Sequence, residues 1–178
     1  DVGIASGVVS VALGDEHTCA LFDTGGVKCW GRNDHGQVGN NSTLNRQVPT
    51  DVVGLAAGVA KIYAKHQQTC AILDTGAVKC WGLNGRGQIG NNGTLDRQVP
   101  TDVTGLGSGV TALALGDEHV CALDTGGGVH CWGRNDRGQV GNNGTLDRQV
   151  PTQVVGLSSG VAAIYAHHQQ TCALMATG

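Results

Sequence analysis

Paired cysteines at a fixed spacing carry the clearest chemistry in this 178-residue sequence. Cys19 and Cys29 are ten residues apart and flank a turn centred on Thr24. In an antiparallel hairpin with this centre they lie directly opposite each other, with Cα atoms roughly 4.5–5.5 Å apart, a separation that a disulfide accepts. The spacing recurs twice, so the sequence predicts three disulfides: Cys19–Cys29, Cys70–Cys80 and Cys121–Cys131. Cys172 begins a fourth hairpin and has no partner at this spacing in the chain.

Two other uses of the cysteines fit this pattern less well. Structural zinc sites use a much tighter spacing, and a catalytic thiol does not recur identically in every repeat. Disulfides contribute roughly 2–4 kcal/mol each and form in oxidising compartments. The sequence therefore predicts a secreted protein that is extracellular or on the cell surface.

The histidines fall into two groups. His17 and His119 occupy one position of the repeat, and we expect each to be hydrogen-bonded to the neighbouring repeat. His66, His167 and His168 fall at the same end of alternate repeats, where imidazoles could bind zinc, copper or nickel. No carboxylate stands next to these three in the sequence, so we predict no metal site.

Two acidic pairs could look like catalytic carboxylates: Asp15-Glu16 and Asp117-Glu118. Adjacent residues of a strand point to opposite faces, so neither pair easily shares one substrate atom, and a solvated rim is the expected role. The sequence contains no nucleophile elbow, phosphate loop or zinc-protease motif. It therefore predicts neither an enzyme nor a cofactor.

Tryptophans and asparagines also recur at fixed positions. The tryptophans are expected to pack between repeats and to donate a hydrogen bond there, with ligand stacking as the alternative: Trp30, Trp81 and Trp132. Three sequons are candidates for N-glycosylation, and they are equally good turn sequences; they begin at Asn41, Asn92 and Asn143.

The whole chain repeats with a period of 51 residues. Each repeat opens with a segment such as Val8–Leu13, whose alternating apolar positions predict a strand. The hairpin adds two strands, and Gln37-Val38 is a further short candidate. Pro49 recurs in each full repeat and indicates an edge strand or a connection, whereas no helix is expected. We predict a single repeat domain, 1–178, with repeats 1–51, 52–102, 103–153 and a partial repeat 154–178.

Neighbouring repeats differ in where they carry a large residue. Tyr63 and Tyr165 stand in the second and fourth repeats where Ala12 and Ala114 stand in the first and third. Alternating bulk lets adjacent sheets interdigitate. We therefore expect both tyrosines to pack between repeats, with Tyr63 directed toward space left by a small residue of the adjacent repeat.

The repeat resembles the regulator of chromosome condensation repeat family over essentially the whole chain. The matching segments are Val11-Ala12-Leu13-Gly14-x-x-His17-Thr18-Cys19-Ala20-Leu21, Gly26-Val27-Lys28-Cys29-Trp30-Gly31-x-Asn33-x-x-Gly36-Gln37-Val38-Gly39 and Val48-Pro49. The resemblance implies an all-β fold, a β-propeller with four-stranded blades of about 51 residues. The chain would form three full blades plus half of a fourth. Its paired cysteines are most similar to the secreted bacterial branch of the family.

Composition and resemblance together indicate a binding protein. Charged residues make up 14% of the chain and the net charge is −3, which argues against a nucleic-acid partner, and no run is long enough to span a membrane. We predict a non-enzymatic scaffold for protein–protein interaction, with a partner of unknown identity. The alternatives are a subunit that self-assembles into a ring or filament through exposed blade edges, and a guanine nucleotide exchange factor for a small GTPase.

The fourth hairpin lacks its second half. The partner expected for Cys172 falls four positions beyond Gly178, and the chain opens on Asp1 as a processed protein does. We therefore expect these residues to be part of a longer propeller chain in which Cys172 is bonded; the alternative is that the edge of another molecule covers the gap.

Overall fold

The computed structural model describes residues 6–177, and these form strands and turns in four sheets. The first and last residues, Asp1 and Gly178, lie outside the described residues. The strands are β1 (Val8–Leu13), β2 (His17–Phe22), β3 (Val27–Gly31), β4 (Arg46–Asp51), β5 (Val59–Lys65), β6 (Gln68–Leu73), β7 (Val78–Gly82), β8 (Arg97–Asp102), β9 (Val110–Leu115), β10 (His119–Asp124), β11 (Val129–Gly133), β12 (Arg148–Gln153), β13 (Val161–His167) and β14 (Gln170–Met175).

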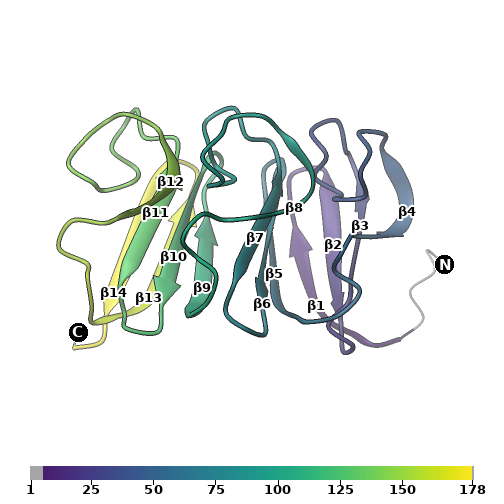
Figure 1. The fold of residues 1–178 in the computed structure, drawn as a ribbon, viewed down its shortest axis with the longest axis horizontal. Helices are drawn as coiled ribbons and strands as arrows, with labels where there is room; N and C mark the ends of the chain where they lie inside the picture. The colour runs from purple at the N-terminus through teal and green to yellow at the C-terminus, as the bar shows by residue number, and fades with distance from the viewer. Residues whose placement is uncertain (1–5, 178) are drawn as a thin grey trace.

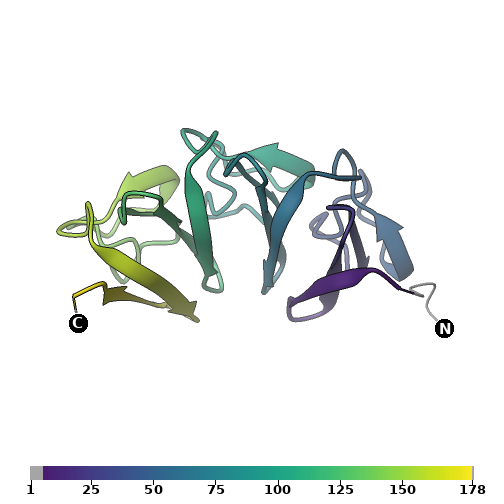
Figure 2. The same cartoon turned by 90° about the horizontal axis from the view of Figure 1, so that it is seen from below.

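The sheets are the blades of a partial β-propeller. Blades 1, 2 and 3 contain four antiparallel strands each, in chain order, and blade 4 contains β13 and β14. The blades stand side by side (Figure 1), and they follow an arc with β1 and β13 on its concave side (Figure 2). The all-β prediction of three full blades plus half of a fourth is confirmed. Residues 6–177 include no helix long and apolar enough to cross a membrane.

The hairpin between the second and third strands has the register that the cysteine spacing predicts. Cys19 lies opposite Cys29, and the Phe22 amide donates to the Gly26 carbonyl at 2.9 Å to close the turn. The structure contains the three predicted disulfides, each with a Cα–Cα distance of 4.1 Å: Cys19–Cys29, Cys70–Cys80 and Cys121–Cys131. Each disulfide thus joins the two middle strands of a full blade, and all six sulfurs are fully buried.

Three hydrophobic clusters hold the blades together. We call the contact of blades 1 and 2 seam 1, that of blades 2 and 3 seam 2, and that of blades 3 and 4 seam 3. Seam 1 contains Ala12 and Ile62, seam 2 contains Val78 and Leu113, and seam 3 contains Ala114 and Ile164. The core of this protein therefore lies between the sheets.

Two local expectations are corrected by the structure. Gln37 and Val38 lie in a turn, because the long loop after β3 folds back on itself before β4 begins at Arg46. The acidic pair Asp15-Glu16 lies in the bend between β1 and β2 and not on a strand, so strand alternation does not separate these carboxylates. Pro49 lies in β4, an edge strand, as predicted.

The two tyrosines have different surroundings, and Tyr63 packs between blades as predicted. Tyr63 packs against the seam 2 cluster, which contains Leu113 and Leu115, whereas Ala114 faces seam 3. Tyr63 therefore packs into a seam that contains Leu113 and Leu115, and Ala114 does not face it because alternate residues of a strand point to opposite seams. Tyr165 is 62% exposed on a blade that no other blade follows among the described residues, so its packing between blades stays a prediction.

Candidate interaction surface

A buried asparagine organises the long loop that precedes the outer strand of each full blade. The Asn84 amide nitrogen donates to the carbonyls of Gly93 and Leu95 at 3.0 and 2.9 Å, and its side-chain oxygen accepts from the Ile89 amide at 2.9 Å. Asn33 and Asn135 make the equivalent contacts. All three asparagines are fully buried. Each loop therefore has a fixed backbone.

These loops carry exposed leucines at one position of the repeat. The backbone of each leucine is bound by the buried asparagine, and its side chain is 69–75% exposed. We call these residues the leucine row: Leu44, Leu95 and Leu146. These leucines were not identified from the sequence, although every full repeat has a leucine two residues before an arginine. Exposed apolar side chains on rigid loops are suited to contact another protein.

Polar contacts link the loops of successive blades. His35 Nδ1 lies 2.7 Å from Asp96 Oδ2, between blades 1 and 2. Arg86 Nη1 donates to Asp147 Oδ2 at 3.3 Å, between blades 2 and 3. The backbone N–H of Asn41 donates to the carbonyl of Gln98 on blade 2 at 3.0 Å. The backbone N–H of Asn92 donates in the same way to the carbonyl of Gln149 on blade 3. The leucine-bearing loops are thus tied into one continuous edge of the arc.

A guanidinium fixes acidic residues on the rim of blades 1 and 3. Arg134 donates to Glu118 and Asp136 at 2.8 and 2.7 Å, and the hydrogen bonds from Arg134 and Gln139 lower the pKa of Asp136 to about 2. Arg32 makes the same contacts with Glu16 and Asp34. Glu16 and Glu118 of the acidic pairs therefore form ion pairs, the first exposed and the second partly buried, and an exposed pair contributes little to stability.

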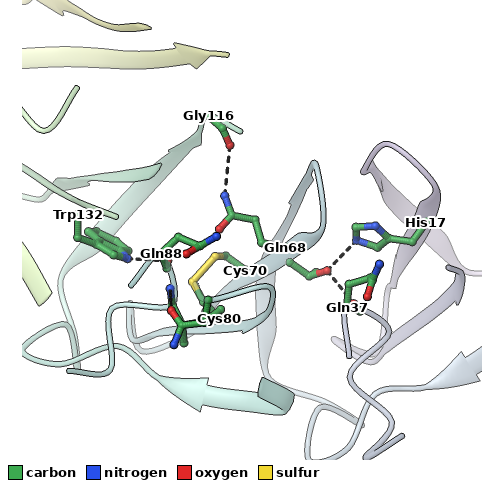
Figure 3. Close-up of a disulfide and its surroundings, with 11 residues drawn as sticks. His17, Gln37, Gln68, Cys70, Cys80, Gln88, Gly116 and Trp132 are labelled. Atoms are coloured by element: carbon green, nitrogen blue, oxygen red, sulfur yellow. Dashed lines mark hydrogen bonds between the residues drawn. A yellow bond between two sulfur atoms is a disulfide. The ribbon is translucent and has the colours of Figure 1, made fainter. Parts of the chain in front are cut away.

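The two equivalent histidines are buried in the seams. His17 Nε2 lies 2.8 Å from Thr69 Oγ1 across seam 1 (Figure 3), and His119 Nε2 lies 2.9 Å from Thr171 Oγ1 across seam 3. This confirms the predicted hydrogen bond to the neighbouring blade. Burial lowers the pKa of both imidazoles to about 4, against the opposing effect of Asp15 or Asp117. Both histidines are therefore neutral at pH 7.

Two of the three tryptophans are fully buried between blades. Trp81 Nε1 donates to the Gln37 carbonyl across seam 1, and Trp132 Nε1 donates to the Gln88 carbonyl across seam 2 (Figure 3), both at 2.9 Å. Trp30 belongs to blade 1 and is only partly buried. The predicted packing between blades therefore holds for Trp81 and Trp132 and stays a prediction for Trp30, because no blade precedes blade 1 among the described residues.

The remaining candidate residues lie at the surface. His168 Nδ1 is 3.0 Å from Asp117, and His66 Nε2 is 4.0 Å from Asp15, so carboxylates do lie beside these imidazoles in space, contrary to expectation. Within residues 6–177, no three His, Cys, Asp or Glu side chains gather as metal ligands would. The sequon asparagines are exposed and have left-handed backbones, with φ of 57°, 59° and 60° at Asn41, Asn92 and Asn143. Their glycosylation stays a prediction.

Comparison with known families identifies the repeat. A family model described as "Regulator of chromosome condensation (RCC1) repeat" matches residues 24–72, 75–123 and 126–174. A second model with this description matches residues 8–37, 59–88 and 110–139. The chain belongs to the RCC1 repeat family.

The relatives of this RCC1-repeat chain include much longer proteins. It is 34% identical over 154 residues to human E3 ubiquitin-protein ligase HERC2, which corresponds to 84% of this chain and 3% of that protein. The structure of Prp20p from Saccharomyces cerevisiae matches with a TM-score of 0.82 at 20% identity, over 93% of this chain and 43% of Prp20p. Yeast RCC1 (Prp20) bound to Kap60 matches with a TM-score of 0.78 at 28% identity, over 94% and 41% of the two chains. The chain thus spans less than half of the length of each of these relatives.

Proposed function

We propose that this chain is a non-enzymatic RCC1-repeat scaffold, secreted from the cell, which binds a protein partner through the leucine row. The observation that carries the proposal is the repeated exposure of Leu44, Leu95 and Leu146 on loops whose backbones are fixed by buried asparagines. A loop that is already ordered loses little conformational entropy on binding. Each leucine contributes roughly 1.5–3 kcal/mol if a partner buries it fully.

Known relatives and the charge of the chain support a protein as the partner. Prp20p is described as binding Gsp1p and histones, and yeast RCC1 (Prp20) has been solved bound to Kap60; all of these partners are proteins. The net charge of −3 disfavours binding to the phosphates of a nucleic acid. The partner therefore has to offer apolar pockets that accept the three leucines.

The disulfides support the secreted location. Every full blade has its own bond between the two middle strands, and disulfides persist in oxidising compartments. Fractionation of source cells, with alkylation of free thiols at lysis, tests this part separately. We expect the protein in the medium or on the surface with these cysteines blocked. Reduced protein in the cytosol overturns the secreted assignment and leaves the leucine row untouched.

A matched pair of triple variants tests the leucine row. In the first, Leu44→Ser, Leu95→Ser and Leu146→Ser remove the apolar groups of the row. In the control, serine replaces three exposed valines elsewhere: Val48, Val53 and Val155. Both proteins serve as bait in the culture medium of the source, with capture quantified by mass spectrometry. We expect the wild-type bait and the control bait to capture the same partner protein and the leucine variant to lose it. Equal capture of that partner by both variants contradicts the proposal.

A second candidate function is self-assembly, and the two end faces of the arc favour it. Blade 1 exposes Val9, Val11 and Leu13 at 55–66%, and blade 4 exposes Tyr165 and Leu174 at 62% and 55%. Within the chain, the positions of Leu13 and Tyr165 correspond to those of Leu115 and Tyr63, which pack together in seam 2. Light scattering across a concentration series should then show association that Val11→Asp abolishes. A monomer at every concentration excludes this candidate.

A further inference from the structure

The long loop of each full blade contains a buried glutamine with a fixed amide group. In blade 1, Gln37 Oε1 accepts the backbone N–H of His35 at 3.0 Å, and Gln37 Nε2 donates to Asp34 Oδ1 at 3.4 Å. In blade 3, Gln139 Oε1 accepts a backbone N–H in the same way, and its Nε2 donates to Asp136 Oδ1 at 3.2 Å. In both blades the glutamine therefore binds an aspartate of its own loop.

Blade 2 has the glutamine but lacks the aspartate. Gln88 Oε1 accepts the backbone N–H of Arg86 at 2.8 Å, so the amide has the same orientation as in the other two loops. Gly85 stands where Asp34 and Asp136 stand in blades 1 and 3. Gln88 is fully buried, and its Nε2 has no hydrogen-bond partner among residues 6–177. A buried donor without a partner is costly, and a carboxylate in the place of the missing aspartate satisfies it.

The place of the aspartate side chain is open in blade 2. A Cβ added at Gly85 would have no heavy atom within 4 Å, and Gly85 is exposed. Gly85 is not among the glycines with a positive φ, so its backbone conformation does not require glycine. The glycine therefore leaves room at this position without being needed for the turn.

A positive charge stands beside this open place. In blade 3, Arg134 lowers the pKa of Asp136 to about 2, chiefly through a hydrogen bond, and the charge of Arg137 contributes to the shift. Arg86 stands at the position of Arg137 in blade 2, whereas Leu83 stands at the position of Arg134. A carboxylate at Gly85 thus has one guanidinium nearby and not two, so a ligand that carries it needs further contacts with the protein.

An acidic residue of the same loop is compatible with a carboxylate at this position. In blade 3, Asp147 Oδ1 accepts the backbone N–H of Asn135 at 2.8 Å, directly before Asp136. In blade 2, Asp96 Oδ1 accepts the backbone N–H of Asn84 at 2.8 Å. The charge of Asp96 therefore stands where blade 3 already accommodates a second carboxylate.

We propose that the open place at Gly85 binds the carboxylate of an aspartate or glutamate side chain of the protein partner, with Gln88 Nε2 as its buried donor. This carboxylate takes the position that an aspartate of the loop itself takes in blades 1 and 3. Asn84 binds the carbonyl of Leu95, so the site lies in the loop that carries the middle leucine of the leucine row. The partner as the source of the carboxylate rests on the proposed function, whereas the carboxylate site is independent of it.

A peptide titration followed by nuclear magnetic resonance tests the site directly. The nitrogen-15-labelled protein is titrated with acetyl-Gly-Asp-Gly-amide, and with acetyl-Gly-Asn-Gly-amide as the uncharged control at the same ionic strength. We expect the acidic peptide to shift the Gln88 side-chain NH₂ signals saturably and to leave those of Gln37 and Gln139 in place, because their donors already have carboxylate partners. The same shift with both peptides, or no shift of Gln88, overturns the proposal.

Acetyl-triglycine with a free carboxyl terminus distinguishes the two sources of a carboxylate. We expect it to bind more weakly than the aspartate peptide, because side-chain carboxylates occupy this position in blades 1 and 3. Tighter binding of acetyl-triglycine contradicts the assignment to an acidic side chain.

Substitutions fill the site from the chain itself. Gly85→Asp should abolish the peptide response of Gln88 and raise the melting temperature by about 2–4 °C more than Gly85→Ala, because alanine changes the backbone entropy alone. Gly107→Asp adds the same charge at another exposed glycine with nothing within 4 Å of its Cβ and should keep the peptide response. Equal melting temperatures for Gly85→Asp and Gly85→Ala contradict the site.

Two further measurements separate this site from the leucine row. The triple leucine variant should give the wild-type peptide response of Gln88, and loss of that response contradicts a separate carboxylate site. As bait in the culture medium, Gly85→Asp should capture less of the partner than Gly107→Asp does. Equal capture by these two variants contradicts the use of the site by the partner, whereas absence of capture by the wild-type bait contradicts the proposed function.

Discussion

Seams 2 and 3 are built from equivalent residues but differ in what fills them. In seam 2, Trp132 is fully buried against Gly90 and bonded to the Gln88 carbonyl. In seam 3, Gly141 and the Gln139 carbonyl border a cavity of about 500 Å³. The comparison teaches that burial of a side chain in this fold depends on the neighbouring blade as much as on the residue itself. A closed seam stabilises the protein, because it removes apolar side chains from water.

The largest expected difference in stability is between a tryptophan buried in a seam and one at the end of the arc. Trp132→Ala removes a fully buried indole from seam 2 and should lower the free energy of unfolding by about 3–5 kcal/mol. Trp30→Ala is the matched control, because Trp30 is only partly buried, and it should cost less than about 1 kcal/mol. Urea denaturation measures both. A similar decrease in the free energy of unfolding for both variants would show that packing in a seam does not determine how much a tryptophan stabilises the protein.

Protonation of the seam histidines gives the next largest effect. The pKa of His17 and His119 is about 4 in the folded protein and about 6.5 in the unfolded chain. Between these values the unfolded state binds more protons, so stability falls as the pH falls from 6.5 to 4. The loss is on the order of 3 kcal/mol for each histidine at the lower limit.

Urea denaturation at pH 7 and pH 4.5 measures this dependence. The single substitutions are His17→Gln in seam 1 and His119→Gln in seam 3. Each should reduce the pH dependence of the free energy of unfolding by a similar amount, because both imidazoles contact a threonine across their seam. An unchanged profile in either variant shows that its imidazole is not buried in the neutral form.

Gly116 provides a smaller test within seam 3. A Cβ at this position would meet the ring of His119 and lie 2.7 Å from the His168 carbonyl of blade 4. Gly116→Ala should therefore destabilise the protein by about 1–3 kcal/mol through overpacking. Gly107→Ala is the control, because nothing lies within 4 Å of its added Cβ. Thermal melting of both variants decides whether blades 3 and 4 pack this closely in solution.

The tyrosines give the smallest expected difference. Tyr63→Ala removes a half-buried ring from seam 2 and should cost about 2 kcal/mol. Tyr165→Ala changes a ring that is 62% exposed and should stay within about 0.5 kcal/mol. Equal melting temperatures for Tyr63→Ala and wild type would mean that the Tyr63 ring is free in solution.

Local patterns predicted much of this fold from the sequence. The ten-residue cysteine spacing determines the hairpin register, since residues equidistant from a turn pair directly, and Pro49 marked an edge strand because it has no amide hydrogen. Burial at the ends of the arc was not predictable in this way. Trp30 and Tyr165 have the same local sequence as buried equivalents, and only the absence of a neighbouring blade among the described residues exposes them.

The candidate site was harder to recognise than the fold. Asn33 was visible as part of the repeat, but nothing local showed that its amide reaches across the loop to the Leu44 carbonyl. That contact joins residues eleven positions apart in a segment without periodicity. The exposed leucine could therefore be interpreted only after the loop was folded, because a lone leucine in a sequence is ordinarily assigned to the core.

Photocrosslinking at the leucine row tests the proposed function most directly. A diazirine analogue of leucine is placed at Leu95 in one protein and at Val53, an exposed position outside the row, in another. Both are irradiated in the culture medium of the source and analysed by mass spectrometry. We expect the analogue at Leu95 to crosslink to one protein and the analogue at Val53 not to do so. Crosslinks to that protein from both positions, or from Val53 alone, contradict a partner surface at the leucine row.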